Sequence, residues 1–302
     1  MTTRWFKDLW LLMRDAAIAW DDDDLVEQGA ALAYYTVFAL SPFLILMIVL
    51  SSVGFGQEAS SGHLVDQIRG LIGVEGAQFV QTLITNAYRA DSNVLATVVS
   101  TIMVLLGASA VFVQLRNSLN ASWRVTHTPM GTIRGFIQTR LFAIAVILGI
   151  GFLLLVSLVF SAVLAAVSDY LGRNIAQLAG LVNVVEFLMS FVGVTVMFAL
   201  MFKFIPDAIV NWSDVWVGAG VTSVLFALGK LVIGVYLGNG AIGSTFGAAS
   251  SLVIIMLWAF YSAQIVLFGA EFTRLYATRF GSGIRPGANA VHVVAQVRAT
   301  LP

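Results

Sequence analysis

Two ionisable side chains, Glu186 and Lys230, fall inside long apolar stretches of this 302-residue chain. Placing such a group in the hydrocarbon of a membrane costs about 2.5–3.5 kcal/mol, so each is a candidate for function. From the same end of their stretches, Lys230 lies roughly 10 Å deep and Glu186 roughly 12 Å deep, at about 1.5 Å per helical residue. Matched depth and opposite charge predict an ion pair, which either gates a cavity, binds a charged group or is structural. The alternative is a lysine that reaches the headgroups along its own stem.

A second group of polar side chains lies toward the ends of two other apolar stretches: Tyr34, Tyr35, Gln264 and Glu271. Gln264 and Glu271 are seven residues apart and share one helix face. Pro42 removes a backbone hydrogen bond nearby and predicts a kink. Together these residues predict a polar cavity, or substrate pathway, between two helices. The alternative is interhelical hydrogen bonding, with Glu271 and Arg274 as a solvated helix end.

Patterns typical of hydrolytic or nucleotide-driven enzymes are missing from the sequence. The three histidines, His63, His127 and His292, have no metal-ligand spacing, and the chain contains no cysteine and no GxxxxGK[ST]. The run Asp21–Asp24 fits a helix cap better than a cation site, because adjacent carboxylates cannot all face one point. We therefore expect no enzymatic activity, no cofactor, no metal and no nucleic-acid partner.

The elements that must position these residues are six long apolar runs. They are Ala30–Val53, Val94–Val113, Leu141–Val167, Leu178–Phe202, Val215–Leu237 and Phe246–Ala270. Each is long enough to cross a hydrocarbon layer of about 30 Å as a helix, and each is continuous rather than alternating. With 59% hydrophobic and 11% charged residues, the sequence predicts an all-α, polytopic bundle of six transmembrane helices with additional amphipathic interfacial helices.

The basic residues predict the orientation of this bundle. Twelve Lys and Arg residues fall on one set of sides of the six runs and three on the other, with Lys230 inside a run. Because cytoplasmic loops carry the excess of positive charge, both termini are expected in the cytoplasm.

The segments that flank the membrane domain divide the chain into three parts. Residues 1–29 form a cytoplasmic segment, residues 30–276 the membrane domain, and residues 277–302 a cytoplasmic tail. The helical stripe at 4–20 predicts an interfacial helix, with packing on other cytoplasmic segments as the alternative. Within the membrane domain, an outer amphipathic loop at 54–93 either covers the bundle or lies on lipid. An inner Arg-rich loop at 114–140 faces anionic headgroups.

A glycine-rich segment, Gly234–Gly247, interrupts the last two runs. Gly238, Gly240 and Gly243 make a stiff helix unfavourable here, so they are candidate hinge positions together with Pro42. The segment is either a tight turn or a re-entrant piece that lines a cavity.

Three stretches carry a resemblance to a known family. They are AALAYYTVFALSPFLILMIVL at 30–50, LRNSLNASWRV at 115–125 and FGAASSLVIIMLWAFYSAQIVLFGAEFTRLYATR at 246–279. In this order they resemble the YihY/BrkB family of bacterial inner-membrane proteins. The resemblance implies a six-span bundle in the inner membrane. Some family members carry an old ribonuclease label and others a virulence-factor label, and transport roles have been proposed for relatives.

These observations together predict transport of a lipid or another amphipathic envelope component, with membrane lipids as partners. An ion- or proton-coupled carrier would use Glu186, Lys230 or Glu271 as titrating groups. A non-transporting scaffold would bind envelope-assembly proteins through residues 54–93. The substrate, the direction and energy source of transport, and the oligomeric state do not follow from the sequence.

Overall fold

The computed structural model describes residues 2–55, 77–78, 80–82, 85, 109–127, 179–238, 250–287 and 290–293. The helices with defined bounds are α1 (Thr2–Asp22), α2 (Leu25–Phe55), α6 (Ala179–Phe204), α7 (Trp212–Gly238) and α9 (Ser250–Arg279). Residues 109–122 are also helical. The strands are β1 (Val125–His127), β2 (Ala208–Ile209), β3 (Arg285–Pro286) and β4 (Ala290–His292). The mostly helical fold is thus confirmed, whereas the four short strands were not predicted.

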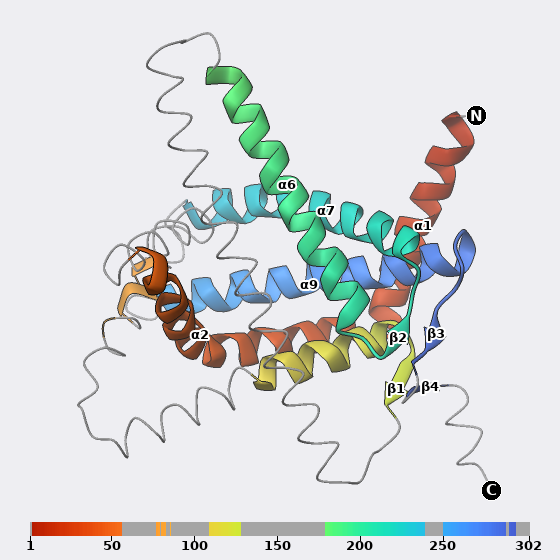
Figure 1. The fold of residues 1–302 in the computed structure, drawn as a ribbon. Helices are drawn as coiled ribbons and strands as arrows, with labels where there is room; N and C mark the ends of the chain where they lie inside the picture. The colour runs from red at the N-terminus through yellow and green to blue at the C-terminus, as the bar shows by residue number, and fades with distance from the viewer. Residues whose placement is uncertain are drawn as a thin grey trace, which may run out of the picture.

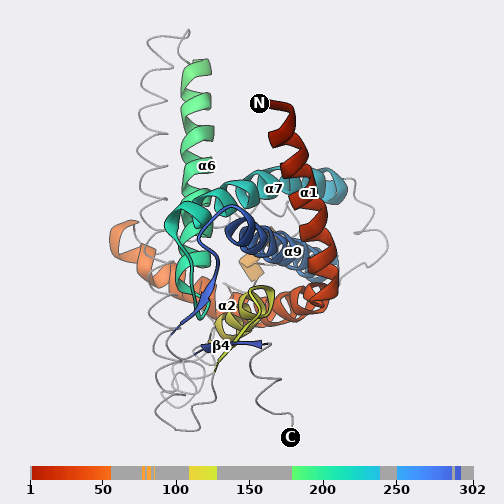
Figure 2. The ribbon, with the colours of Figure 1, turned by 90° about the vertical axis from the view of Figure 1, so that its right-hand side faces the viewer.

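Helix α9 lies at the centre of the described part of the molecule. It packs against α1, α2 and α7, and α6 packs against α7. Figure 2 looks nearly along α9 and shows α7 and α2 on opposite sides of it, with α1 beside it; Figure 1 shows the same helices from the side. The core near its C-terminal half contains large side chains, among them Trp123, Phe198 and Phe202. Residues of α9 therefore contact most of the described elements.

Helix α1 packs on α9. Leu12 and Ala16, which belong to the predicted apolar stripe, are buried against Phe272 of α9. Arg279 at the end of α9 also approaches Asp15 of α1, with 3.8 Å between Nη1 and Oδ2. One face of α1 is thus packed on α9, and contact of its other face with lipid stays a prediction.

Helices α7 and α9 approach each other through paired glycine and threonine residues. A Cβ at Gly218 would collide with Thr273, and a Cβ at Gly269 would collide with Thr222. Each threonine hydroxyl donates to the carbonyl one turn earlier in its own helix, Thr222 to Gly218 at 2.8 Å and Thr273 to Gly269 at 2.6 Å. Small residues with internally satisfied hydroxyls are typical of close helix contacts in membranes.

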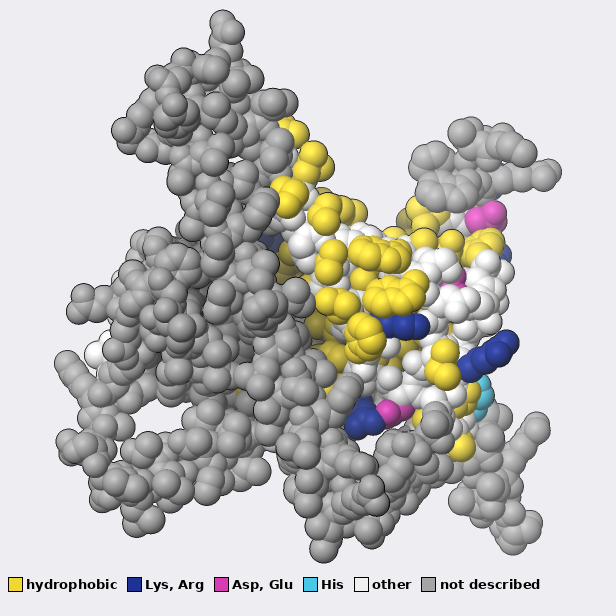
Figure 3. Space-filling model, viewed as in Figure 1, with side chains coloured by type: hydrophobic (Ala, Val, Ile, Leu, Met, Phe, Trp, Pro, Cys, Tyr) yellow, Lys and Arg dark blue, Asp and Glu magenta, His cyan; other side chains and the backbone are white. Residues whose placement is uncertain are grey.

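Two helices in the described part of the chain are long and apolar enough to cross a membrane. They cover Trp212–Ile233 in α7 and Leu252–Arg279 in α9, and α6 adds a shorter apolar helix at Leu188–Phe204. Only 33% of the most apolar window of α7 and 39% of that of α9 are buried within the structure. Figure 3 shows hydrophobic side chains gathered over the visible faces of α6 and α7. The first predicted span lies within α2, whose side chains are described only to Leu40, and the second, third and fourth include residues outside the described ranges, so the number six stays a prediction.

The strands form two small antiparallel sheets at one end of the bundle. β1 pairs with β4, with Val125 opposite His292 and His127 opposite Ala290. β2 pairs with β3, with Ile209 opposite Arg285. Each sheet has only two strands, and its partners come from distant parts of the sequence. The chain after α9 thereby joins the segments that follow the 109–122 helix and α6.

Candidate functional site

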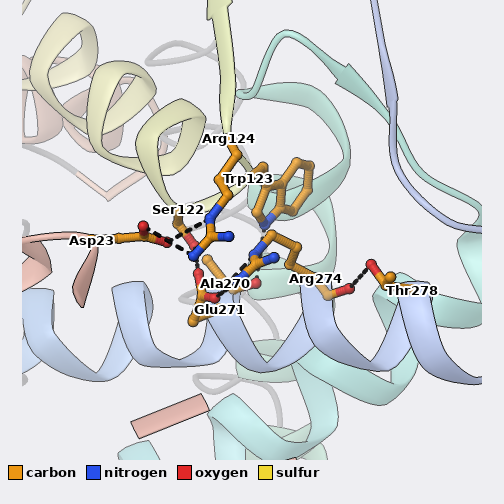
Figure 4. A network of polar contacts seen from close by, with 8 residues as sticks. All are labelled: Asp23, Ser122, Trp123, Arg124, Ala270, Glu271, Arg274 and Thr278. Carbon is orange, nitrogen blue, oxygen red and sulfur yellow. Dashed lines mark hydrogen bonds and ion pairs between the residues drawn. The ribbon is translucent and has the colours of Figure 1, made fainter. Parts of the chain in front are cut away.

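Glu271, on α9, is the largest buried acidic side chain among the described residues. Its side chain is 0% exposed. The Arg274 Nε donates to Glu271 Oε1 at 2.9 Å, the Arg274 Nη2 also donates to Oε1, and the Ser122 hydroxyl donates to Oε2 at 2.9 Å (Figure 4). A buried carboxylate is stable only when it is paired and hydrogen-bonded in this way.

Trp123 fixes the chain segment that supplies Ser122. Its indole N–H donates to the carbonyl of Ala270 at 3.0 Å, and its ring, 1% exposed, packs near Phe202. Ser122 and Trp123 therefore contact consecutive residues of α9. This arrangement places the turn after the 109–122 helix directly over Glu271.

Arg124 extends the network to the turn between α1 and α2. Its Nε and Nη2 donate to the two carboxylate oxygens of Asp23 at 3.1 and 3.2 Å (Figure 4). This hydrogen bond raises the pKa of Arg124 above its ordinary value. Arg124 has a left-handed φ of 53°, as does Asp24, so both turns are tight. We call Asp23, Arg124, Glu271 and Arg274 the charge cluster; it joins three separate segments of the chain.

A second network, around Asp207, joins the same helix to the α6–α7 loop. Arg116 donates to both carboxylate oxygens of Asp207, with the Nε bond at 2.9 Å. The Asn120 amide donates to Asp207 Oδ2 and accepts from the Asp207 backbone N–H, each at 2.8 Å. Both charged side chains are only about 15% exposed. This bidentate and reciprocal arrangement fixes the loop against the 109–122 helix.

Amide side chains connect α2 to its neighbours. The Gln114 amide donates to Gln28 Oε1 at 2.9 Å, and the Ser118 hydroxyl donates to the same oxygen at 3.2 Å. On the other side of α2, the Gln264 amide donates to the Val26 carbonyl at 3.1 Å, which is possible because Gly29 leaves room for it. The Gln264 Oε1 is buried and accepts no hydrogen bond from any residue that the structure describes.

The four residues predicted to line a cavity lie in different surroundings. Tyr34 and Tyr35 are 53% and 37% exposed, and Tyr34 contacts the Phe38 ring at 4.8 Å between centroids. Gln264 lies in the α2–α9 contact, and Glu271 in the charge cluster. Among the described residues, no hydrogen bond or ring contact joins the tyrosines to Gln264 or Glu271. The structure thus connects Glu271 to Ser122 and Arg274 instead.

The other predicted site residues are described only in part. Lys230 is exposed on α7, whereas the side chain of Glu186 lies outside the described residues, so their ion pair stays a prediction. Pro42 lies within α2, which is assigned as one helix to Phe55, and the kink there also stays a prediction. Gly238 is the last residue of α7. Gly240 and Gly243 fall outside the described residues.

Most of the charged partners were not predicted from the sequence. Arg116 and Arg124 were expected in a loop facing headgroups, and the Asp21–Asp24 run was expected to cap a helix. In the structure Arg116 pairs with Asp207, and Arg124 pairs with Asp23. The spacing of Arg116 and Asn120, four residues apart on one helix face, was the available signal of a shared partner.

The charge cluster contains two acids and two bases in two ion pairs, which the consecutive residues Ser122, Trp123 and Arg124 connect. The cluster thereby ties the α1–α2 turn and the end of the 109–122 helix to α9. Within the described ranges, no group of three or more His, Asp or Glu side chains is arranged to bind a metal ion.

Comparison with known proteins assigns the chain to a family. The family model described as virulence factor BrkB matches residues 17–292. A UPF0761 membrane protein of Stenotrophomonas maltophilia is 27% identical over 83% of this chain and 57% of its own length. A second, from Alcanivorax borkumensis, is 25% identical over 84% of this chain and 57% of its own length. A third, from Neisseria meningitidis, is 24% identical over 90% of this chain and 66% of its own length.

The chain therefore spans a little over half the length of the first two of these relatives. No solved structure matches it. Because the family model covers nearly the whole chain, and because the curated relatives are named membrane proteins, the chain is a membrane protein that belongs to the virulence factor BrkB family.

Proposed function

We propose that the protein moves a lipid or another amphipathic component of the bacterial envelope, using six spans in the inner membrane with both termini in the cytoplasm. The observation that carries the proposal is the charge cluster. It contains Glu271, a fully buried carboxylate inside a candidate span, which accepts hydrogen bonds from Ser122 outside that span and from Arg274 within it. Ionisable residues at such positions typically mark substrate or ion pathways.

A transport role is preferred to an enzymatic one because of how Glu271 is bonded. Both of its carboxylate oxygens accept hydrogen bonds, from Arg274 and from Ser122. A general acid or base needs an oxygen that can reach a substrate proton. The bonding of Glu271 therefore favours an electrostatic role in closing the bundle.

The surfaces near the cluster suit a molecule with polar and apolar parts. Helices α2 and α9 pack against each other and contain the polar contact between Gln264 and Val26. On the outer side of α2, Tyr34 and Phe38 are 53% and 63% exposed. A headgroup would move along the polar contact while acyl chains remain against the exposed aromatic face.

The two ion pairs of the cluster differ in how easily they separate. Arg124 and Asp23 are 48% and 19% exposed, and an exposed pair contributes only about 0–1 kcal/mol. Glu271 and Arg274 are 0% and 13% exposed. Separation of Asp23 from Arg124 would release the turn after the 109–122 helix, which lies over Glu271, from the α1–α2 turn. The Asp23–Arg124 pair thus acts as the gate on the cytoplasmic side.

The absence of cysteines allows a direct test of this gate. Purified Asp23→Cys/Arg124→Cys protein is reconstituted in liposomes with fluorescent phospholipids and linked with a short, cleavable bismaleimide. Transfer of label between leaflets should stop on linking and return when the linker is cleaved. In the control, Lys7→Cys/Arg14→Cys, which places both sites on α1, linking should leave transfer unchanged. Continued transfer in the linked Asp23→Cys/Arg124→Cys protein would contradict the gate.

A proton-coupled carrier is the second candidate, because Glu271 is a buried carboxylate in a candidate span. The same liposomes, loaded with a pH-sensitive dye, separate the two functions. Proton flux without lipid transfer, lost in Glu271→Gln, would favour the carrier. Lipid transfer without proton flux would favour the first proposal. If neither is seen and an envelope protein binds through residues 54–93, the scaffold function is supported.

A further inference from the structure

Most of the basic side chains in the described helices and strands contact a carboxylate. Those that do are Arg14, Arg116, Arg124, Arg274 and Arg279. Lys7, Lys203, Lys230 and Arg285 make no ion pair with a described carboxylate. Of these four, Lys203 and Arg285 lie at the end of the bundle where β2 pairs with β3. Asp207 and Asp214 are close to Lys203 in the sequence, but Asp207 accepts from Arg116, and Asp214 accepts from Ser282 at 3.1 Å. Two basic side chains without an ion pair to a described carboxylate therefore lie at this end of the molecule.

Exposed aromatic rings lie beside Lys203. Its Nζ is 5.6 Å from the centre of the Trp212 ring, and Phe204 and Trp216 contact Trp212 with centroids 5.9 and 6.5 Å apart. These three aromatic residues are 42–52% exposed. Half-exposed tryptophan next to a lysine is typical of the headgroup depth of a membrane, where the ring has an apolar and a wet side.

Arg285 lies on the same part of the surface. In the sheet of β2 and β3 it is the direct partner of Ile209, and both residues are exposed. Directly opposed residues in an antiparallel pair project from the same face. Lys203 Nζ donates to the carbonyl of Val210, the residue that follows Ile209. Lys203 and Arg285 therefore flank residues 209–212, and Figure 3 shows basic side chains bordering the hydrophobic surface over this end of α6 and α7.

We propose that this surface binds the phosphate headgroup of an anionic phospholipid. Its residues are Lys203, Phe204, Ile209, Trp212, Trp216 and Arg285, which we call the Lys203–Arg285 patch. The two cations supply donors for the phosphate, and the aromatic rings border the glycerol region. The exposed side chains of α6 and α7 beyond the patch, such as Val192 and Val224, provide the apolar surface for the acyl chains.

Charge complementarity is the reason for choosing a lipid over a free anion. A soluble phosphate would contact only the two cations. The exposed apolar side chains around them would bury no surface against it and so would add nothing to the binding free energy. An anionic lipid uses both parts of the patch at once. Lys203 lies in the last turn of α6, where a cation interacts favourably with the helix dipole. Arg285 lies on a strand, so no helix dipole accounts for its position.

The test is native mass spectrometry of the full chain in mild detergent, titrated with phosphatidylglycerol or phosphatidylcholine. The wild type should bind phosphatidylglycerol more tightly. Lys203→Gln/Arg285→Gln should weaken phosphatidylglycerol binding about thirtyfold, since one cation near an anionic lipid contributes roughly five- to sixfold, and should leave phosphatidylcholine binding unchanged. Lys203→Arg/Arg285→Lys should retain the preference, and Arg285→Gln alone should give an intermediate loss.

The matched control is Lys7→Gln/Arg14→Gln, which removes two exposed charges from α1. Equal losses in the two double variants would show a net-charge effect and overturn the patch. Binding of inorganic phosphate in phosphatidylcholine micelles, dependent on Lys203 and Arg285, would overturn the lipid assignment in favour of a soluble anion. Because this experiment measures lipid binding and not transport, it can refute the Lys203–Arg285 patch without refuting the Asp23–Arg124 gate. The cross-linking experiment can likewise refute the gate without refuting the patch.

Discussion

At the scale of single residues, the ion pairs of this protein differ in their contact with water. Arg116 and Asp207 are 16% and 15% exposed, whereas Arg14 and Asp15 are 58% and 40% exposed. Arg116→Ala should lower the free energy of unfolding by about 3 kcal/mol, because it leaves the Asp207 carboxylate partly buried and without its cation. Arg14→Ala should change it by less than about 0.5 kcal/mol. Equilibrium unfolding by SDS in mixed micelles measures both, and equal effects would refute the structural role of Asp207.

Glu271 and Arg274 allow a second test, by a double-mutant cycle. Arg274→Gln should cost about 3–5 kcal/mol because it leaves the buried Glu271 charge without the cation that pairs with it. Adding Glu271→Gln should restore part of the loss, since two amides can hydrogen-bond without a buried charge. Strict additivity of the two single changes in the same SDS titration would show that the pair does not interact.

The sequence led to Glu271 but not to its partners. An acidic residue in an apolar run is conspicuous because its burial is costly, and this needs no knowledge of the fold. Ser122, Asp23 and Arg124 look like ordinary polar residues near helix ends. Their role depends on contacts between segments distant in sequence, which periodicity does not report. Tyr34 and Tyr35 were predicted from their position near the end of an apolar run beside Pro42; both are partly exposed on α2, and their place in a cavity stays a prediction.

At the scale of elements, the α7–α9 contact yields a prediction with an internal control. Gly218→Ala should destabilise the protein by about 1–3 kcal/mol, because the new Cβ collides with Thr273. Gly220→Ala, two residues away on the same helix, should be neutral or stabilise by up to about 1 kcal/mol, because no atom lies within 4 Å of its Cβ. The two variants can be compared by heating in detergent followed by size-exclusion chromatography. Similar melting midpoints would contradict the close approach.

Helices were predictable from the sequence because each run repeats one signal over many residues. The stripe of Leu12 and Ala16 predicted a helical face, but not that Phe272 covers it. Strands of two or three residues carry no such signal. β2 and β3 exist only because the α6–α7 loop and the chain after α9 meet at one end of the bundle. Propensity within either segment could not indicate that meeting.

At the scale of the whole molecule, the 12:3 charge bias predicts the orientation of every loop. In the cysteine-free chain, single cysteines at Gly62, Gly172 and Asn239 should react with an impermeant maleimide added to intact cells. Cysteines at Lys7, Asn117 and His292 should react only after permeabilisation. Reaction of any member of the second set in intact cells would reject the six-span topology. Lys7, Asn117 and His292 are exposed, so a label at these positions does not disturb the packing of the described residues.

The two small sheets also determine the order in which parts of the molecule can fold during translation. Residues 125–127 and 208–209 leave the ribosome well before 285–286 and 290–292, so the backbone groups that later form each ladder are unpaired during most of translation. The end of the molecule that contains the two sheets is thus the last part to complete its backbone hydrogen bonds. Ribosome-arrested chains that stop before residue 285 should be cut by protease within the 205–211 loop. Arrested chains that have released residues 285–292 should resist, and equal cleavage would show that the loop closes without its strand partner.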